Sequence, residues 1–240
     1  MCGICGIYNP WGLDAEDGAA LGRMTEVLAH RGPDDSGSRA DSHAALGHTR
    51  LSIVDIDGGA QPMGNEDGSV WAVFNGEIYN FEALRADLVK KGHRFHSRSD
   101  TETLVHGYET YGEDLVMKLD GMFAFAVWDS RSRRLLLARD RVGKKPLYYA
   151  RAGGRLLFAS EIKSILMHPR VSRAADHDSL MHIMSFQHVP GEATAFQGKR
   201  IMPPANFMVV GGDGPVEETP RRYWFPLHIK AEKNSAGDGL

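Results

Sequence analysis

Residues 1–10 of the chain read MCGICGIYNP. From Gly3 onward the stretch is a short apolar run with one internal glycine, which predicts a buried strand at the very start of the fold. Cys2 would lie at the mouth of this strand. The only two cysteines of the chain, Cys2 and Cys5, both fall here, and two thiols this close in sequence cannot staple a chain of 240 residues. The two cysteines therefore need an explanation other than a disulfide framework.

The composition is that of an ordinary globular protein. Hydrophobic residues make up 42% and charged residues 25%, which argues against both a disordered and a membrane class. With 28 Lys and Arg against 31 Asp and Glu, the net charge is −3. The sequence contains no long basic run of the kind that binds nucleic acid. No apolar run approaches the ~18 residues that would span a bilayer, and the start lacks the features of a signal peptide. We expect a cytoplasmic protein without nucleic-acid or membrane partners.

Apolar spacing predicts helices in the first half of the chain. Residues 14–30 carry apolar side chains at helical intervals, and residues 81–91 predict a second helix. Asn80 is expected to cap this second helix and Gly92 to end it. A third helix is expected to follow Ser99.

The remaining apolar runs are typical of strands. Strands are expected at 43–55 and 70–80, the second broken by a turn at Asn75-Gly76, and the RGPDDSG segment at 31–37 is expected to be a loop. Four short β-rich runs then predict an antiparallel meander, at 122–129, 134–140, 146–150 and 155–160. Short helices at 161–168 and 178–186 and a last strand at 206–211 complete the pattern. This order does not fit regular βαβ alternation, so we expect an α+β fold with stacked antiparallel sheets and helices outside.

Cys2 is a candidate nucleophile because removal of Met1 would make it the first residue. The thiol and a free α-amine would then belong to one residue. An α-amine has an ordinary pKa of about 7.7–8.0, so a useful fraction is neutral near physiological pH and can take a proton, directly or through one water. The same logic applies to N-terminal threonine nucleophiles. From its position alone, Cys2 is equally well explained as an incidental small residue near a terminus.

The Cys2-x-x-Cys5 spacing also raises a metal or a redox interpretation, and the context disfavours both. A structural zinc needs two further ligands, and a thioredoxin-like pair lies at the start of a helix, whereas this pair opens a strand-like run. Two histidine pairs have finger-like spacing but lie far away in sequence, His43/His48 and His182/His188. We therefore expect Cys5 to be a buried small hydrophobic residue, and we expect no metal in this chain.

Other residues could serve an acyl-transfer nucleophile. Asn75 offers a side-chain amide and Gly76 an unhindered backbone N–H for an oxyanion, although Asn-Gly alone is also typical of a hairpin turn. Arg50, a cation among apolar residues, suits a bidentate grip on a carboxylate or a salt bridge at the rim. Asp100 lies at an expected helix start, where it could cap the helix or hold an ammonium group. The segment led by His30-Arg31 could brace a site or simply connect two elements, and the connecting loop is the simpler interpretation.

The order Cys2, Arg50, Asn75-Gly76, Asp100 resembles the glutaminase domain of class II glutamine amidotransferases, a family with an N-terminal cysteine. Longer phrases are similar to the asparagine synthetase branch of that family: HRGPDDSG, RLSIVD, FNGEIYNFEALR, SDTE, DGMFAFAVWD, RDRVGKKPLYY and HVPGEATAFQGKRIMPPANFMV. The resemblance runs from Cys2 to Trp224, where RRYW resembles the exit of the domain.

The resemblance implies an N-terminal nucleophile hydrolase fold, a four-layer αββα sandwich of two antiparallel sheets, which agrees with the α+β expectation. It implies a glutaminase domain at residues 1–224, followed at 225–240 by a linker or the start of a synthetase domain.

The resemblance also implies an activity and its residues. Cys2 would attack the side-chain amide of glutamine, and Asn75 with the Gly76 N–H would stabilise the oxyanion, so that ammonia leaves and water hydrolyses the thioester to glutamate. The implied substrate contacts come from side chains and from backbone: Arg50 on the α-carboxylate, Asp100 and Glu77 on the α-ammonium, and Leu51 and Val54 along the pocket.

The implied partner of this domain is an ATP-dependent asparagine-synthetase-type domain that accepts the ammonia. Its S-G-G-x-D-S phosphate loop does not occur in this sequence, and the VVGGDGP stretch at 209–215 has no hydroxyl residue to bind phosphate. ATP and magnesium are therefore expected only for that other domain, and no cofactor is expected in this chain. Formation of a homodimer is left as an open alternative. The alternative function is a catalytically silent glutamine-binding or assembly module that needs its partner domain.

Overall fold

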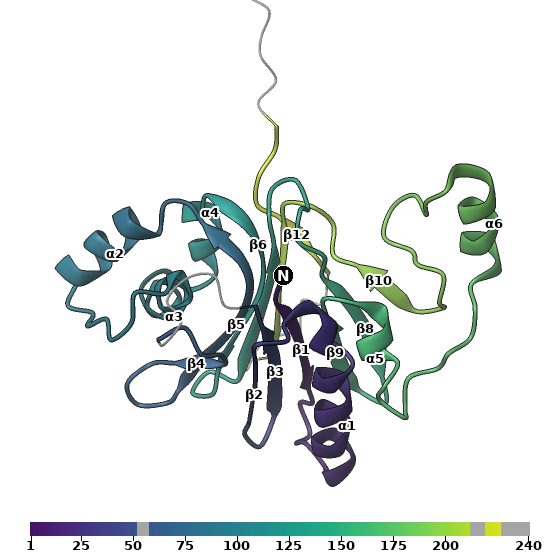
Figure 1. Ribbon diagram of the computed structural model, residues 1–240, viewed down its shortest axis with the longest axis horizontal. Coiled ribbons are helices and arrows are strands. Elements are labelled where there is room, and N and C mark those ends of the chain that lie inside the picture. The colour runs from purple at the N-terminus through teal and green to yellow at the C-terminus, as the bar shows by residue number, and fades with distance from the viewer. Residues whose placement is uncertain (52–57, 212–218, 227–240) are drawn as a thin grey trace, which may run out of the picture.

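The computed structural model describes residues 1–51, 58–211 and 219–226, and these residues form two stacked antiparallel sheets flanked by helices (Figure 1). The first sheet has the strand order β10-β8-β9-β1-β3-β2 and the second the order β12-β11-β7-β6-β5-β4. The strands of the first sheet are β1 (Gly3–Tyr8), β2 (Asp35–Ala40), β3 (Ala44–Arg50), β8 (Tyr148–Ala152), β9 (Arg155–Ala159) and β10 (Lys199–Ile201). Those of the second are β4 (Met63–Gly64), β5 (Val70–Ile78), β6 (Gly121–Asp129), β7 (Arg134–Arg139), β11 (Asn206–Gly211) and β12 (Arg221–Arg222).

Helices cover the outer face of each sheet. The helical elements are α1 (Ala15–Glu26), η1 (Ala29–Arg31), α2 (Phe81–Lys90), α3 (Asp100–Tyr111), η2 (Gly112–Asp114), α4 (Leu115–Lys118), α5 (Ile162–Ile165) and α6 (His177–Phe186). α1 and α5 pack on the first sheet, while α3 packs on the second sheet and carries α2. Figure 1 shows α2 and α3 on one side of the molecule and α6 on the opposite side. The four layers thus run helix, sheet, sheet, helix, as expected from the sequence.

The opening stretch of the chain is buried because β1 is an interior strand of its sheet. β1 pairs with β3 on one side and with β9 on the other. Ile4 and Tyr8 point into the apolar layer between the two sheets, whereas Cys5 and Ile7 point into the layer under α1. A strand that is covered on both faces needs apolar residues throughout rather than in alternation, which accounts for the continuous run GICGIY. Cys5 is fully buried, as predicted, and burial raises the pKa of its thiol to about 11.

Several predicted elements are confirmed. The strand at the N-terminus is β1, and the helix at 81–91 is α2, after which Gly92 takes a positive φ of 102°. Asp14 caps α1 through a hydrogen bond from the Asp17 N–H. Among the helices of the described ranges, none is long and apolar enough to cross a membrane.

Four local predictions are wrong. Asn75-Gly76 does not form a turn but lies inside β5, where Asn75 faces Ala124 of β6. The predicted meander is divided, since β6 and β7 pair in the second sheet and β8 and β9 in the first. The predicted loop at 31–37 runs into β2. Asn80 precedes α2 without capping it, because its side-chain oxygen instead accepts from the Asp120 N–H at 3.0 Å.

Two further predictions lie outside the described residues. Val54 falls in the undescribed stretch 52–57, and most of the expected linker at 225–240 falls in the stretch 227–240.

Candidate active site

Seven of the eight residues proposed from the sequence line a single pocket. The pocket lies at the ends of β1 and β3, against β5 and the first turn of α3. Its lining comprises Met1, Cys2, Arg50, Leu51, Gly59, Gln61, Phe74, Asn75, Gly76, Glu77, Ser99, Asp100, Thr101 and Lys145. The eighth residue, Val54, is outside the described residues.

Strand pairing places Cys2 beside Arg50. β1 and β3 are antiparallel with Gly3 opposite Thr49, so the next residues outward on each strand are Cys2 and Arg50. The Cys2 Sγ lies 3.8 Å from the Leu51 carbonyl oxygen, to which the thiol donates. Arg50, which is 6% exposed, is the last residue of β3. The register of these two strands therefore brings the candidate nucleophile and the candidate carboxylate-binding cation together.

Arg31 fixes the backbone of Cys2. Its Nε donates to the Cys2 carbonyl oxygen at 2.9 Å, and its Nη1 donates to Glu161 Oε1 at 2.8 Å. His30 and Lys163 also contact the Glu161 carboxylate, at 3.0 Å and 3.2 Å. Partial burial alone would raise the pKa of Glu161, but the hydrogen bonds from Arg31, His30 and Lys163 outweigh it and hold that pKa at about 2. The segment beginning at His30 thus braces the backbone of Cys2 and also connects α1 to β2.

The open edge of β5 supplies backbone donors to the pocket. β5 pairs with β4 only at Trp71 and Ala72, so its edge beyond Ala72 carries no neighbouring strand in the described chain. The Phe74 N–H donates to Gln61 Oε1 at 2.6 Å and the Ile78 N–H to Asp100 Oδ2 at 3.0 Å. Because alternate N–H groups of a strand point the same way, the Gly76 N–H between them is directed at the same edge.

Gly76 is required by packing rather than by turn geometry. A Cβ at this position would lie 2.2 Å from the Met122 carbonyl oxygen and 2.8 Å from the Phe123 Cα, both in β6. Its neighbour Asn75 points the other way, toward the layer between the sheets that also holds Val73. The Asn75 Nδ2 is buried and has no hydrogen-bond partner among the described residues. A buried amide without a hydrogen-bond partner is unfavourable in free energy, so this N–H group is available to an acceptor that enters the pocket.

Asp100 is held at the start of α3 by its backbone contacts. Ser99, not Asp100, caps the helix through the Thr101 N–H, so the capping role considered for Asp100 is wrong. The Asp100 carboxylate also reaches across to β5, where it accepts from the Ile78 N–H. Burial raises its pKa, the hydrogen bonds from Ile78 and from its own helix start oppose this, and the nearby Glu77 raises it further. Two neighbouring carboxylates at the pocket wall would be stabilised by a bound cation.

Four lining residues were not proposed for the site from the sequence. Gln61 accepts from the Phe74 N–H and donates to the Thr101 hydroxyl at 3.2 Å, so it joins β5 to α3. Lys145, which is 8% exposed, reaches the pocket from the segment between β7 and β8. Ser99 and Thr101 flank Asp100. The phrases containing Ser99, Thr101 and Lys145 were recognised in the sequence, but only the folded structure shows that these residues line the pocket with Cys2.

A larger hollow of about 610 Å³ lies elsewhere, between α1 and β2, and includes Thr25, Asp34, Ser36 and Thr49. It contains no thiol, and neither Asn75 nor Asp100 lines it. Of these two hollows in the described chain, only the smaller one at Cys2 holds the donors that suit acyl transfer.

A family model described as "Glutamine amidotransferase domain" matches residues 1–224. The chain belongs to this family. The glutamine amidotransferase domain thus covers the whole of both sheets and all the pocket residues named above.

Curated relatives of this glutamine amidotransferase domain are asparagine synthetases. Asparagine synthetase [glutamine-hydrolyzing] 3 of Bacillus subtilis (strain 168) is 40% identical over 98% of this chain and 38% of its own length. Asparagine synthetase [glutamine-hydrolyzing] 1 of the same organism is 40% identical over 90% of this chain and 34% of its own length. The chain therefore spans little more than a third of the length of these relatives.

Solved structures confirm the fold. The allosteric regulatory enzyme of purine biosynthesis superposes with a TM-score of 0.67 at 18% identity, covering 94% of this chain and 50% of that one. The glutamine phosphoribosylpyrophosphate amidotransferase of B. subtilis superposes with a TM-score of 0.63 at 18% identity and the same coverage. The predicted four-layer αββα sandwich of N-terminal nucleophile hydrolases is thus the fold of this amidotransferase domain.

Proposed function

We propose that this domain hydrolyses glutamine to glutamate and ammonia with Cys2 as its nucleophile. The observation that carries the proposal is the meeting, in one pocket, of the Cys2 thiol with the unpartnered Asn75 amide and the outward-facing Gly76 N–H. Family membership and the identity to glutamine-hydrolysing synthetases support the substrate.

The first half of the reaction forms a thioester. Once Met1 is removed, the α-amine of Cys2 takes the thiol proton, and the sulfur attacks the side-chain carbonyl carbon of glutamine. The carbonyl oxygen becomes an oxyanion that accepts hydrogen bonds from Asn75 Nδ2 and the Gly76 N–H. Collapse of this intermediate breaks the C–N bond, and the proton held by the α-amine passes to the leaving group, which departs as ammonia.

The second half regenerates the thiol. The α-amine takes a proton from water, and the resulting hydroxide attacks the γ-glutamyl thioester, whose oxyanion occupies the same two donors. The C–S bond breaks, the sulfur recovers the proton, and glutamate leaves. Arg31, by holding the Cys2 carbonyl, would keep both the sulfur and the amine in place during these steps.

Substrate recognition is proposed to use the charged walls of the pocket. Arg50 would bind the α-carboxylate of glutamine, and Asp100 with Glu77 would receive its α-ammonium. The raised pKa of Asp100 supports this assignment, since a bound ammonium would relieve the unfavourable burial of that carboxylate and its repulsion by Glu77. Backbone at Leu51 and Val54 is proposed to line the pocket.

The ammonia acceptor is proposed to be an ATP-dependent asparagine-synthetase-type domain. This rests on the curated relatives, which are named asparagine synthetases and are more than twice the length of the matched region. Magnesium and ATP would bind that domain, and residues 225–240 would lead toward it.

Steady-state release of glutamate from glutamine tests the proposal. The wild-type chain with Met1 removed should turn over, and Cys2→Ala should not. A correctly folded wild-type chain that binds glutamine saturably but releases no glutamate would instead support the silent binding module.

A further inference from the structure

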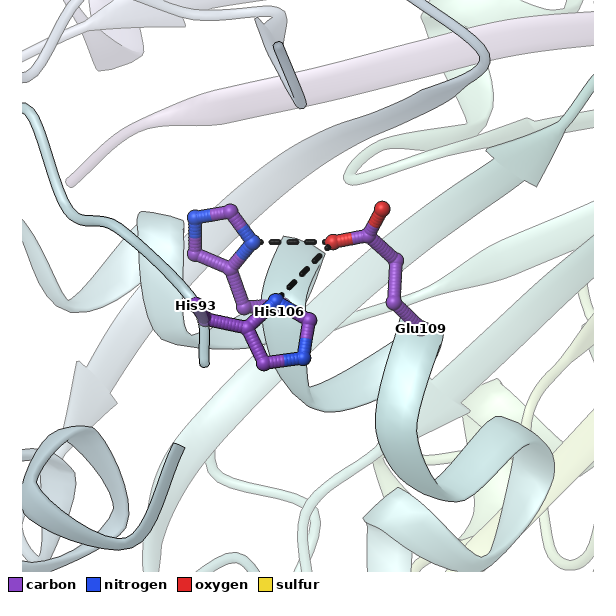
Figure 2. A group of neighbouring side chains, drawn as sticks. All are labelled: His93, His106 and Glu109. Atoms are coloured by element: carbon purple, nitrogen blue, oxygen red, sulfur yellow. Dashed lines mark hydrogen bonds and ion pairs between the residues drawn. The ribbon is translucent and has the colours of Figure 1, made fainter. Parts of the chain in front are cut away.

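His93, in the segment after α2, lies beside His106 and Glu109 in the C-terminal half of α3, and Figure 2 shows the three side chains together. His106 Nδ1 lies 2.8 Å from Glu109 Oε2, and His93 Nδ1 lies 3.6 Å from the same oxygen. One ligand atom from each of the three residues lies within 4.8 Å of the other two. None of the three lines the Cys2 pocket, so the cluster is separate from the chemistry proposed above.

The fold explains why these side chains meet. His106 and Glu109 are three residues apart on α3 and therefore share one face of the helix. His93 is anchored just beyond α2, where its backbone N–H donates to the Leu88 carbonyl oxygen at 3.1 Å. His106 is buried, whereas His93 and Glu109 are partly exposed, so an ion in solution can reach the cluster.

The hydrogen bonds of His93 direct its lone pair at the cluster. The Thr110 hydroxyl donates to the His106 carbonyl oxygen at 3.0 Å, so toward His93 its oxygen can only accept. His93 Nε2 lies 2.8 Å from that oxygen and must carry the hydrogen. In its neutral form the ring therefore presents an unprotonated Nδ1 toward Glu109 Oε2, 3.6 Å away. A lone pair that faces a carboxylate is unfavourable, so this arrangement needs a positive charge there, either a metal cation between the two atoms or a proton on the ring.

The other two side chains are also held from behind. Glu109 Oε1 accepts from Asn65 Nδ2 at 2.7 Å, which leaves Oε2 facing both rings. His106 Nε2 lies 3.7 Å from Glu102 Oε1, and Glu102 is itself fixed by the backbone N–H groups of His96 and Ser97. A histidine whose far nitrogen faces a carboxylate is the usual arrangement behind a metal-bound imidazole.

Size and charge fit a small divalent cation. Ligand atoms about 2.0–2.1 Å from a tetrahedral zinc ion lie about 3.3 Å apart, between the two distances from Glu109 to the rings. Rotation of the partly exposed His93 ring supplies the remaining adjustment. Glu102 and Glu66 add negative charge around His106 beyond that of Glu109 itself.

We propose that His93 Nδ1, His106 Nδ1 and Glu109 Oε2 bind one zinc-class divalent ion, with water as the fourth ligand. Two imidazoles and one carboxylate form a donor set that zinc accepts in proteins. The ion fastens the segment between α2 and α3 to α3, whose first turn carries Asp100. No metal was expected from the sequence, where only the spacing of Cys2 and Cys5 and two other histidine pairs suggested ligands.

Zinc titration by calorimetry on the full chain tests the proposal. The titration uses a Cys2→Ser background, since the terminal thiol and amine of the native protein would themselves bind zinc. We expect one ion per chain and, at zinc concentrations about a hundredfold above the dissociation constant, a rise in Tm of about 5 to 10 °C. Cobalt(II) bound at the same site should give visible absorption bands of tetrahedral strength.

Single substitutions distinguish this site from scattered surface binding. His93→Ala and Glu109→Gln alter partly exposed residues and should weaken zinc binding by more than tenfold. Thr110→Val removes the acceptor behind His93 and the hydroxyl's own hydrogen bond to the His106 carbonyl oxygen, and it should weaken zinc binding about 10- to 100-fold. His182→Ala, on the exposed face of α6, is the matched control and should have no effect.

Two outcomes would overturn the proposal. If the Cys2→Ser protein binds no zinc, the cluster is only a set of histidine–glutamate ion pairs. If it binds zinc with the same affinity in His93→Ala and Glu109→Gln as in their parent, the ion lies elsewhere on the chain.

Discussion

The Nε of Arg31 donates a hydrogen bond to the carbonyl oxygen of Cys2 at 2.9 Å. The same guanidinium reaches Glu161 at 2.8 Å, so a residue 29 positions along the chain ties the proposed nucleophile to the end of β9 and the start of α5. This contact orients Cys2 without touching the substrate, which makes Arg31 a positioning residue.

Arg31→Lys keeps the positive charge but loses the planar guanidinium that donates to the Cys2 carbonyl and to Glu161 at the same time. A shift of about 1 Å at a reacting group can cost about a hundredfold in rate. We expect kcat for glutamine hydrolysis to fall at least tenfold while KM changes much less. Arg170→Lys, at an exposed ion pair with Glu16, is the matched control. Equal kcat in both variants would show that Arg31 is only structural.

Asn75→Ala removes the proposed oxyanion donor. The loss of one such donor lowers kcat by about 10²- to 10³-fold in acyl-transfer enzymes. Because Asn75 Nδ2 has no partner in the described structure, the free energy of unfolding should change by less than about 1 kcal/mol. Steady-state kinetics and urea unfolding measure the two effects. A large loss of stability with little loss of kcat would contradict the assignment.

Arg50→Lys and Asp100→Asn should act mainly on substrate binding. Lysine cannot grip a carboxylate with two parallel hydrogen bonds, and asparagine carries no charge for the ammonium. We expect each variant to raise KM for glutamine about tenfold or more. Glutamine analogues that lack the α-carboxylate or the α-amine provide the check. Arg50→Lys should discriminate less against the first analogue and Asp100→Asn less against the second, and unchanged discrimination would remove these roles.

His48 should make the protein less stable in mild acid. Burial holds the pKa of His48 at about 4, well below its ordinary value near 6.5, with a weaker opposing effect from the Phe74 carbonyl that its Nε2 contacts at 3.3 Å. The unfolded chain therefore takes up a proton at His48 below pH 6.5, whereas the folded chain takes it up only near pH 4. Stability falls through that window, by up to about 3 kcal/mol from this residue.

Urea unfolding of wild type and His48→Asn across pH 4 to 7 isolates this contribution. The difference in unfolding free energy between the two proteins should shrink as the pH falls, because asparagine does not titrate. A difference that stays constant over the whole range would show that His48 does not titrate as described.

Sequence patterns predicted the layers better than the local turns. The continuous apolar run at Gly3–Tyr8 correctly predicted a buried strand, because a strand that is covered on both faces has apolar residues at successive positions. The turn predicted at Asn75-Gly76 was wrong, because residue type at these two positions reports a local preference and not the pairing of strands. That local preference for a turn was overridden by pairing with β6, where only glycine fits under the Met122 carbonyl.

The site was predicted where its residues carry recognisable chemistry. Cys2, Arg50 and Asp100 were found from their types and phrases, and one pocket holds them all. Gln61 was missed, because its role is to link the Phe74 N–H to Thr101, and those contacts exist only after β5 and α3 have packed together. The cluster of His93, His106 and Glu109 was not predicted for the same reason, since its side chains meet only in the folded chain.

Glutamate release, measured together with intact mass, tests the central claim most directly. Protein from which Met1 has been removed should convert glutamine to glutamate, while Cys2→Ala and protein that retains Met1 should be nearly inactive, since neither has a thiol and a free amine on one residue. Turnover that survives Cys2→Ala would contradict the account.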